Sequence, residues 1–368
     1  MVQCVLRVER SIKERAAWKR AVLVVLLLLY PAWASNSRKE KPAISPPPDL
    51  LLEGGRRLIY ERAFSSERDV RKKPGFFGKM LNIIAGEPDM HALVRPYSVA
   101  VDSRGRAIIT DPGADGIHIF DFAQQKYKFI ERRDKGKDSM RSPQCVAVDA
   151  QDNIYVTDSD VGKLFVFNAD GKYQRVIGSL KGGEGYFKRP TGIAVDSAAK
   201  RIYITDTLRD KIFVLDFQGN AVQTIGHHGS GNGEFNFPTE LKLTDQDLVV
   251  VDVMNFRVQL LDRSGIFRTS IGQLGDTSGT MFRPKGVAID SEGHYYVADG
   301  LWGVVQVFDS EGRLLYYFGK RGTAAGDFQL PAGVFIDHGD RVFVVDSYNR
   351  RIQVFQYVGL NKQAGKTL

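Results

Sequence analysis

A repeat of about 47 residues runs through most of this chain and limits the folds that it can adopt. A proline recurs at intervals of 46 to 48 residues, and an aspartate that closes a Val-, Ile- and Tyr-rich stretch recurs in step with it. The prolines are Pro96, Pro143, Pro190, Pro238, Pro284 and Pro331, and the aspartates are Asp111, Asp158, Asp206, Asp252, Asp299 and Asp346. Two markers that stay in phase over six copies indicate an architectural repeat.

Each unit contains four short stretches in which the hydrophobic residues have a period of two. In the second unit these are VAVD, IYVTD, LFVFN and YQRVIG. Such stretches predict β-strands, and Asp, Gly and Ser supply the turns between them, as in DSEG at 290–293 and 309–312. Four-stranded units that repeat around an axis bury their faces against each other. The sequence therefore predicts an all-β, six-bladed β-propeller over residues 96–358.

The sixth unit lacks a fourth strand, because the repeats stop after residues 351–358. The N-terminal region is expected to supply it, and we assign the alternating residues 57–64 (RLIYERAF) as the closing strand. Residues 81–86 are the alternative. Helical spacing of hydrophobic residues predicts a short amphipathic helix over about 75–85, so residues 57–95 form a closing region before the first unit.

Residues 1–34 have the features of a secretory signal peptide. Six Lys and Arg residues precede the apolar run at 21–30, and Ala32 and Ala34 fit a signal peptidase site. The run is shorter than the roughly 20 residues of a membrane-spanning helix. We expect cleavage after Ala34 and an exported protein, periplasmic or extracellular; only an uncleaved leader would attach it to a membrane.

The two segments outside the leader and the repeats are predicted to be irregular. Residues 35–56 are expected to form a linker, of which the polar, proline-rich stretch at 35–49 does not pack, and we expect residues 359–368 to form a flexible tail.

The charge is concentrated at the N-terminus. Residues 1–90 carry 17 basic and 10 acidic residues, so most of the net charge of +8 lies there and the repeats are nearly neutral. Nucleic-acid binding depends on concentrated positive charge, so no nucleic-acid partner is expected. Only Cys4 and Cys145 are present, which excludes zinc-finger chemistry, and Cys145 is expected to be a small packed residue.

Two phrases identify a related family. DVMNFRVQLLD at 252–262 and DSYNRRIQVF at 346–355, each preceded by a glycine-rich loop, resemble NHL repeats. The resemblance covers residues 96–358 and is to exported bacterial six-bladed propellers, although the first two units lack the Asn-x-Arg element. It implies binding of proteins, RNA or sugars more often than catalysis, because only some relatives are lyases or lactonases.

The loops predict one functional face. With strands a to d in each blade, the d–a and b–c loops share one end of the propeller, where binding is sought. The six repeated aspartates are expected to accept backbone N–H bonds within these loops. Arg95, Arg189 and Arg283 precede the proline in blades one, three and five, so they could hold an anion at the channel mouth. The alternative is that each arginine pairs with a nearby loop aspartate.

A partner-binding patch is predicted in the b–c loops of blades four to six, where aromatic and apolar residues fall in successive repeats. Packing between blades is the alternative. The residues assigned to this patch are Met254, Phe256, Arg257, Leu301, Trp302, Tyr348 and Arg350.

No catalytic residue or metal site is predicted, because the six histidines fall at non-equivalent repeat positions and no nucleophile or nucleotide motif occurs. The expected function is a non-enzymatic binding platform for a protein or glycan partner, with no cofactor. The alternative is a lyase or lactonase acting at the channel mouth, which alone would require a divalent metal.

Overall fold

The computed structural model describes residues 46–72, 90–131, 139–180 and 185–360. Five predicted segments lie wholly or partly outside these residues: the signal peptide, residues 35–45 of the linker, the helix at 75–85, the alternative closing strand at 81–86 and most of the tail.

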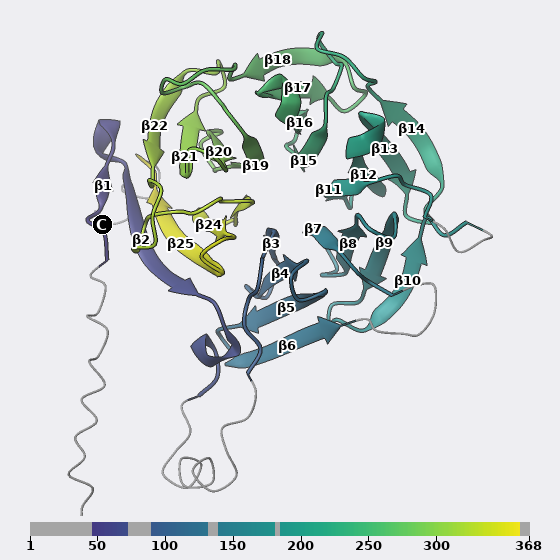
Figure 1. The fold of residues 1–368 in the computed structure, drawn as a ribbon, viewed down its shortest axis with the longest axis horizontal. Coiled ribbons are helices and arrows are strands. Elements are labelled where there is room, and N and C mark those ends of the chain that lie inside the picture. Colours follow the sequence, from purple (N-terminus) through teal and green to yellow (C-terminus); the bar gives the residue numbers. More distant parts are fainter. Residues whose placement is uncertain (1–45, 73–89, 132–138, 181–184, 361–368) are drawn as a thin grey trace, which may run out of the picture. The chain divides into compact units, whose positions relative to one another are not determined.

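Six antiparallel sheets are arranged around a central channel, with the first strand of each sheet innermost (Figure 1). Blades one and two contain β3 (Ser98–Val101), β4 (Ala107–Asp111), β5 (Gly116–Asp121) and β6 (Lys126–Glu131), then β7 (Pro143–Val148), β8 (Ile154–Asp158), β9 (Lys163–Phe167) and β10 (Tyr173–Ile177). Blades three and four contain β11 (Pro190–Asp196), β12 (Arg201–Asp206), β13 (Lys211–Asp216) and β14 (Ala221–Ile225), then β15 (Pro238–Leu243), β16 (Asp247–Asp252), β17 (Arg257–Asp262) and β18 (Phe267–Ile271). Blade five contains β19 (Pro284–Ile289), β20 (Tyr295–Asp299), β21 (Val304–Phe308) and β22 (Leu314–Phe318), and blade six contains β23 (Val334–Ile336), β24 (Arg341–Asp346), β25 (Arg351–Val358) and β2 (Arg57–Phe64). The protein is thus a six-bladed β-propeller with four-stranded blades.

The hydrophobic core lies between the blades. Strands b and c are covered on both faces by neighbouring sheets, so every residue of β8 and β9 is buried. Outer strands such as β22 alternate between partly buried and exposed residues. Across one blade boundary, Ile108 and Ile119 of blade one belong to the same buried cluster as Val146 and Phe165 of blade two. The period of two therefore appears clearly only at the rim, as expected for sheets buried on both sides.

The N-terminal segment completes blade six. β2, the segment that the sequence analysis assigns to this position, pairs antiparallel with β25, with Arg57 opposite Val358 and Phe64 opposite Ile352. The last strand of the ring therefore comes from the opposite end of the chain.

The described end of the predicted linker at residues 35–56 carries a short strand. β1 (Leu50–Leu51) pairs with β2 along its outer side, and Leu50 and Leu52 pack against the core between blades five and six. These leucines cover apolar surface that the outermost strand would otherwise expose, which explains why the chain stays attached here.

The other regular elements are short. They are the 3₁₀ turns η1 (Glu53–Gly55), η2 (Glu67–Asp69), η3 (Thr207–Arg209) and η4 (Val253–Asn255). Across the described ranges, no helix has the length and apolar character needed to cross a membrane.

The repeated aspartates organise one end of the propeller. Asp111 accepts hydrogen bonds from the backbone N–H groups of Val94 and Arg95 at 2.6 and 2.9 Å, and of Gly113 and Ala114 at 2.9 and 3.1 Å. The carboxylate thereby ties the loop that enters strand a to the loop that leaves strand b. All six aspartates are fully buried, and each accepts backbone N–H bonds from the loop that precedes its own blade. Their predicted structural role is confirmed.

Threonines join the first three blades to one another. Thr110, Thr157 and Thr205 precede the repeated aspartate, and each hydroxyl donates to a backbone carbonyl on the innermost strand of the next blade. The acceptors are Gln144, Thr191 and Thr239. Blades four to six have Val251, Ala298 and Val345 at this position. The two halves of the ring therefore differ in how adjacent blades are connected.

We predict that Thr157→Val lowers the free energy of unfolding by about 1–3 kcal/mol, because it leaves the buried Thr191 carbonyl and the Cys145 N–H group without their hydroxyl partner. Valine fits the equivalent site in blades four and six, so the loss is assigned to hydrogen bonding. Chemical denaturation measures it, with Thr157→Ser as the control that keeps the hydroxyl. Equal stability of the Val variant and wild type would contradict this role.

Candidate functional site

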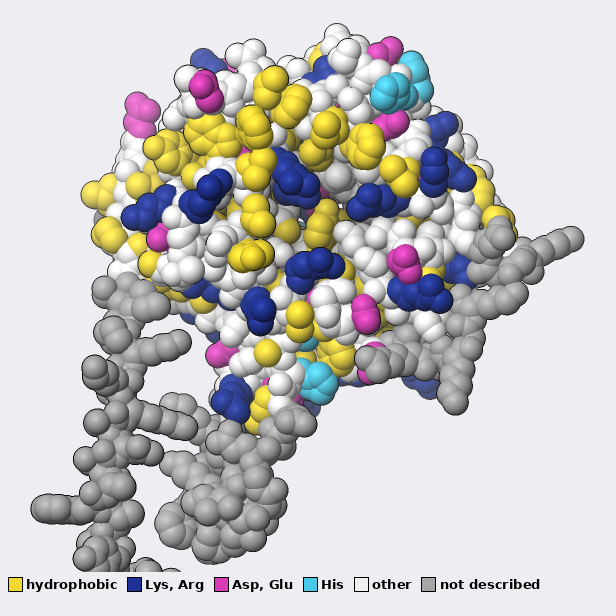
Figure 2. Space-filling view, in the orientation of Figure 1, with side chains coloured by type: hydrophobic (Ala, Val, Ile, Leu, Met, Phe, Trp, Pro, Cys, Tyr) yellow, Lys and Arg dark blue, Asp and Glu magenta, His cyan; other side chains and the backbone are white. Residues whose placement is uncertain are grey.

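The d–a and b–c loops form one surface, which we call the loop face. In blades one, two and five the repeated aspartate accepts backbone N–H bonds from both kinds of loop, and in blades four and six it also accepts a bond from an asparagine side chain of the b–c loop. Figure 2 views this face: hydrophobic side chains gather over blades four to six, and Lys and Arg side chains surround the centre of the ring. These are the two kinds of side chain that the sequence assigns to binding.

The predicted patch residues are only partly accessible. Tyr348 and Met254 are the most exposed of them, at 66% and 49%. Phe256, Leu301 and Trp302 are half-buried. The backbone N–H groups of Leu301 and Trp302 donate to Asp299, which fixes their loop. The b–c loops of blades four and six therefore offer apolar side chains to solvent, and that of blade five contributes less.

The two predicted patch arginines differ. Arg257 donates to the Asp252 carboxylate at 3.0 Å and to the carbonyls of Gly231 and Glu234, so its guanidinium is used within blade four. Arg351 makes the equivalent bonds in blade six. Arg350, in contrast, is exposed. Arg257 therefore supports the loop, whereas Arg350 is available at the surface.

The d–a loops add apolar side chains that the sequence reasoning missed. Phe237, Phe282 and Leu330 lie one or two positions before the repeat prolines, and each is more than a third exposed. Phe282 contacts Phe256, with ring centroids 6.5 Å apart, so the two kinds of loop share one apolar surface. Leu208 of the blade-three b–c loop is also exposed. The sequence contained evidence for these exposed side chains, because large apolar residues occur one or two positions before the repeat proline in blades four to six.

Several of these side chains stand on strained backbone. The residue four positions after each repeated aspartate has a positive φ in all six blades. These residues are Asp115 (52°), Gly162 (64°), Asp210 (52°), Phe256 (56°), Gly303 (71°) and Arg350 (57°). Glycine adopts this conformation freely, whereas a side chain with a Cβ costs roughly 1 kcal/mol there. Phe256 and Arg350 are therefore held at a cost that Gly162 and Gly303 avoid.

The three arginines predicted at the channel mouth line one cavity. Arg95, Arg189 and Arg283 surround a space of about 360 Å³, together with Lys285 on the innermost strand of blade five. The alternative, pairing with the loop aspartates, does not occur. Those carboxylates accept the arginines' backbone N–H groups instead, and the guanidinium groups make no ion pair with any described residue.

Lys285 is a cation in an unfavourable environment. Burial, with the nearby charges of Arg283 and Arg189, lowers its pKa to about 8. No described acidic side chain pairs with its ammonium group. The channel mouth therefore concentrates positive charge that no acidic side chain of the described residues neutralises.

The other ionisable groups near this cavity are neutral or paired. Burial is the main cause of the raised pKa of Tyr97, so its phenol remains neutral. Glu240 pairs with Lys242 at 3.0 Å and lies 3.4 Å from the Cys145 sulfur. Burial and Glu240 raise the pKa of the Cys145 thiol well above its usual value, so this fully buried residue is not a nucleophile, and its prediction as a packed residue is confirmed.

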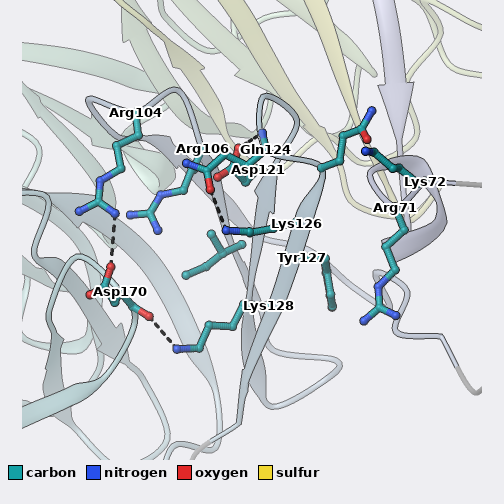
Figure 3. A pocket seen from close by; sticks show the side chains of 12 residues that line it. Arg71, Lys72, Arg104, Arg106, Asp121, Gln124, Lys126, Tyr127, Lys128 and Asp170 are labelled. Atoms are coloured by element: carbon teal, nitrogen blue, oxygen red, sulfur yellow. Dashed lines mark hydrogen bonds and ion pairs between the residues drawn. The ribbon is translucent and has the colours of Figure 1, made fainter.

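A larger basic pocket, of about 730 Å³, lies on the outer side of blade one. Its cations are mostly paired (Figure 3): Arg104 contacts the Asp170 carboxylate at 3.3 Å, Lys128 donates to the Asp170 carbonyl, and Lys126 donates to Gln124. Arg106 pairs with Asp102. The positive charge here is largely neutralised within the protein, unlike that at the channel mouth.

The histidines bind carboxylates singly. His227 lies 3.4 Å from Glu234, and His228 lies 3.0 Å from Asp210, both at the edge of the loop face. His118 of blade one occupies the position of Gln259 and approaches the buried Asp111 at 3.5 Å. Among the described residues, no three His, Cys, Asp or Glu side chains are grouped so that they could hold a metal ion.

We predict that Arg350→Gly raises the free energy of unfolding by roughly 0.5–1 kcal/mol, because glycine relieves the left-handed strain at an exposed position. Denaturant unfolding provides the measurement. The matched variant Arg351→Gly, one residue along, removes the pair with Asp346 and is expected to be less stable than wild type. A destabilised Arg350→Gly variant would show that the strain is offset by contacts of the arginine.

Comparisons with known proteins support the fold. A family model described as "6-bladed beta-propeller" matches residues 144–200 and 194–259. No curated protein matches the chain.

Solved structures with the same fold include proteins of different kinds. Virginiamycin B lyase from Staphylococcus aureus, crystallised with quinupristin, is 16% identical, with 72% of this chain and 84% of that chain covered and a TM-score of 0.52. An auxiliary nutrient binding protein from Bacteroides thetaiotaomicron is 12% identical, with 72% and 70% covered and a TM-score of 0.56. A protein of unknown function from the same organism is 13% identical, with the same coverage and a TM-score of 0.55. At these identities the likeness is one of fold: the chain is a six-bladed β-propeller.

Proposed function

We propose that this protein is a non-enzymatic binding platform that docks a protein or glycan partner on its loop face. The observation that carries the proposal is the group of large apolar side chains that the loops of blades three to six expose together. Six of these side chains are more than a third exposed: Leu208, Phe237, Met254, Phe282, Leu330 and Tyr348. An apolar surface of this kind, bordered by charged residues, is typical of an interaction site.

The backbone beneath this surface supports the same proposal. Phe237, Phe256 and Leu330 all have a positive φ, although none of them is glycine. Phe237 and Leu330 also directly precede a proline, and their side chains remain exposed. A strained backbone that leaves its apolar side chain exposed does not help the protein to fold. It can help binding, because rigid loops that present apolar side chains reduce the entropy lost when a partner binds.

Two further features are part of the proposal. We assign the blades to the NHL type, because Asp252, Asn255, Arg257 and Gln259 form one hydrogen-bonded group in blade four. The same group recurs in blade six with Asp346, Asn349, Arg351 and Gln353. We also propose export, on the grounds of the leader at residues 1–34. The similar fold of an auxiliary nutrient binding protein supports a use of such propellers in binding.

We predict that a Phe256→Ala, Trp302→Ala, Tyr348→Ala triple variant loses partner binding by tenfold or more, because aromatic anchors supply most of the binding energy of such surfaces. Crosslinked affinity capture from the native source, followed by rebinding of the identified partner to purified protein, gives the measurement.

The matched control replaces three exposed apolar residues outside the loop face: Ile266, Leu315 and Tyr317, each changed to Ala. It should bind like wild type, and denaturation midpoints should show that both triple variants are folded. Undiminished binding by the first variant, or loss of binding only by the control, would refute the assignment of the loop face.

Elemental analysis of the purified full-length protein separates this proposal from the lyase or lactonase alternative, which requires a divalent metal. We expect metal well below one equivalent per chain. A stoichiometric divalent metal that survives purification would contradict the binding-platform proposal and favour the enzymatic alternative.

A further inference from the structure

We infer that the channel mouth is a binding site for a compact, multivalent oxyanion, held by Arg95, Arg189, Arg283 and Lys285. This site adjoins the apolar surface proposed for partner docking, since Leu330 lines the cavity as well, but it takes a small ligand. The inference does not depend on the proposed function.

The arrangement of the arginines is the first reason. They occupy the same repeat position in alternate blades, so three guanidinium groups approach the channel axis from three directions around the ring. The intervening blades have Ser142, Phe237 and Leu330 at this position. A ligand at the centre can therefore receive charge-assisted hydrogen bonds from three sides, which suits an anion with several oxygen atoms.

The absence of internal neutralisation is the second reason. In the part of the chain that the structure describes, the cavity has no acidic residue in its lining. The repeated aspartates of the same blades, Asp111, Asp206 and Asp299, are buried and accept the backbone N–H groups of these arginines. The outer pocket of blade one shows the opposite pattern, since Asp170 and Asp102 contact its arginines. Four clustered cations repel each other, so a bound anion relieves an unfavourable interaction.

The rest of the lining fits a small polar ligand. Ser142, Gln144, Ser159 and Ser347 add hydroxyl and amide groups at the mouth. Tyr97 lies at the same cavity and is held neutral, so it does not repel an anion. A volume of about 360 Å³ is at the lower end of the range for small-molecule sites, which favours a compact ligand over a polymer.

Lys285 makes the site sensitive to pH. Its pKa of about 8 means that the ammonium form, which attracts an anion, predominates below pH 8 and is lost above it. The groups that act on it are Arg283 and Arg189, which stay charged, and Cys145, whose thiol pKa is raised by burial and by Glu240. A bound anion stabilises the ammonium form, so binding should weaken as the pH rises from 7 to 9.

Calorimetric titration of the full chain with inorganic phosphate and, separately, with citrate tests the inference. We expect saturable 1:1 binding of at least one of them at pH 7 in 150 mM NaCl, a concentration that screens loose surface attraction. Preference for phosphate would identify a phosphoryl ligand, and preference for citrate a carboxylate ligand.

The variants assign the binding to this cavity. Arg189→Gln and Arg283→Gln should each weaken binding about tenfold. Arg141→Gln is the matched control, because Arg141 lies in the equivalent loop of blade two but does not line the cavity, and it should bind like wild type. Lys285→Arg should retain binding and remove its decline between pH 7 and 9.

Three results would overturn the inference. They are no binding of either probe at millimolar concentration, binding that disappears at 150 mM NaCl, and equal binding by wild type and both Arg→Gln variants. Removal of one positive charge should not unfold the propeller, and a denaturation curve checks this for each variant.

Discussion

The loop face depends on one buried carboxylate in each blade. A carboxylate that is withdrawn from water must find hydrogen-bond donors. Here the donors are backbone N–H groups of the d–a loop in every blade, and in five blades a backbone N–H or asparagine side chain of the b–c loop donates as well. Asp111, for example, joins the residues before Pro96 to the turn after β4. Because the same requirement recurs six times, the loops of all blades are fixed at one end of the ring, and their side chains are free to vary. The surface side chains can therefore differ from blade to blade without loss of the hydrogen bonds that hold the loop backbone.

Variation within that frame produces two different surfaces. The position before each proline carries arginine in blades one, three and five, and serine, phenylalanine or leucine in the others. Because blades alternate around the ring, the arginines meet at the centre, while the apolar residues lie with the b–c loops of blades four to six. The position before the proline thus contributes to the charged mouth in some blades and to the apolar surface in others. Which of the two it contributes to depends on the residue that each blade has there.

The number of blades and the grouping of the three arginines could be predicted from the sequence, because both depend only on the period and phase of the repeat. Six markers in step predict six blades, and repeat equivalence alone brings Arg95, Arg189 and Arg283 to one cavity. Other features depend on contacts between residues that are far apart in sequence, and the repeat period does not predict such contacts. Arg257 was assigned to partner binding from the sequence, whereas its guanidinium donates to carbonyls within its own blade. These carbonyls lie more than 20 residues upstream, so the repeat pattern did not reveal them. Lys285 was missed because its lowered pKa comes mainly from burial, together with Arg283 of its own blade and Arg189 of blade three. The packing of Leu50 and Leu52 was missed because a proline-rich stretch precedes them and the surface that they cover belongs to blades five and six.

The pairing of β2 with β25 has a consequence for how the protein forms. These strands lie at opposite ends of the repeat region, so blade six cannot be completed until β25 has been synthesised. Until then, β2 lacks its partner within blade six, and blades one and six cannot enclose the core between them. The closure of a loop this long is entropically costly and slow, and it leaves strand edges exposed meanwhile. Once the ring is closed, β2 and β25 must separate before blade six can unfold from either end of the repeat region.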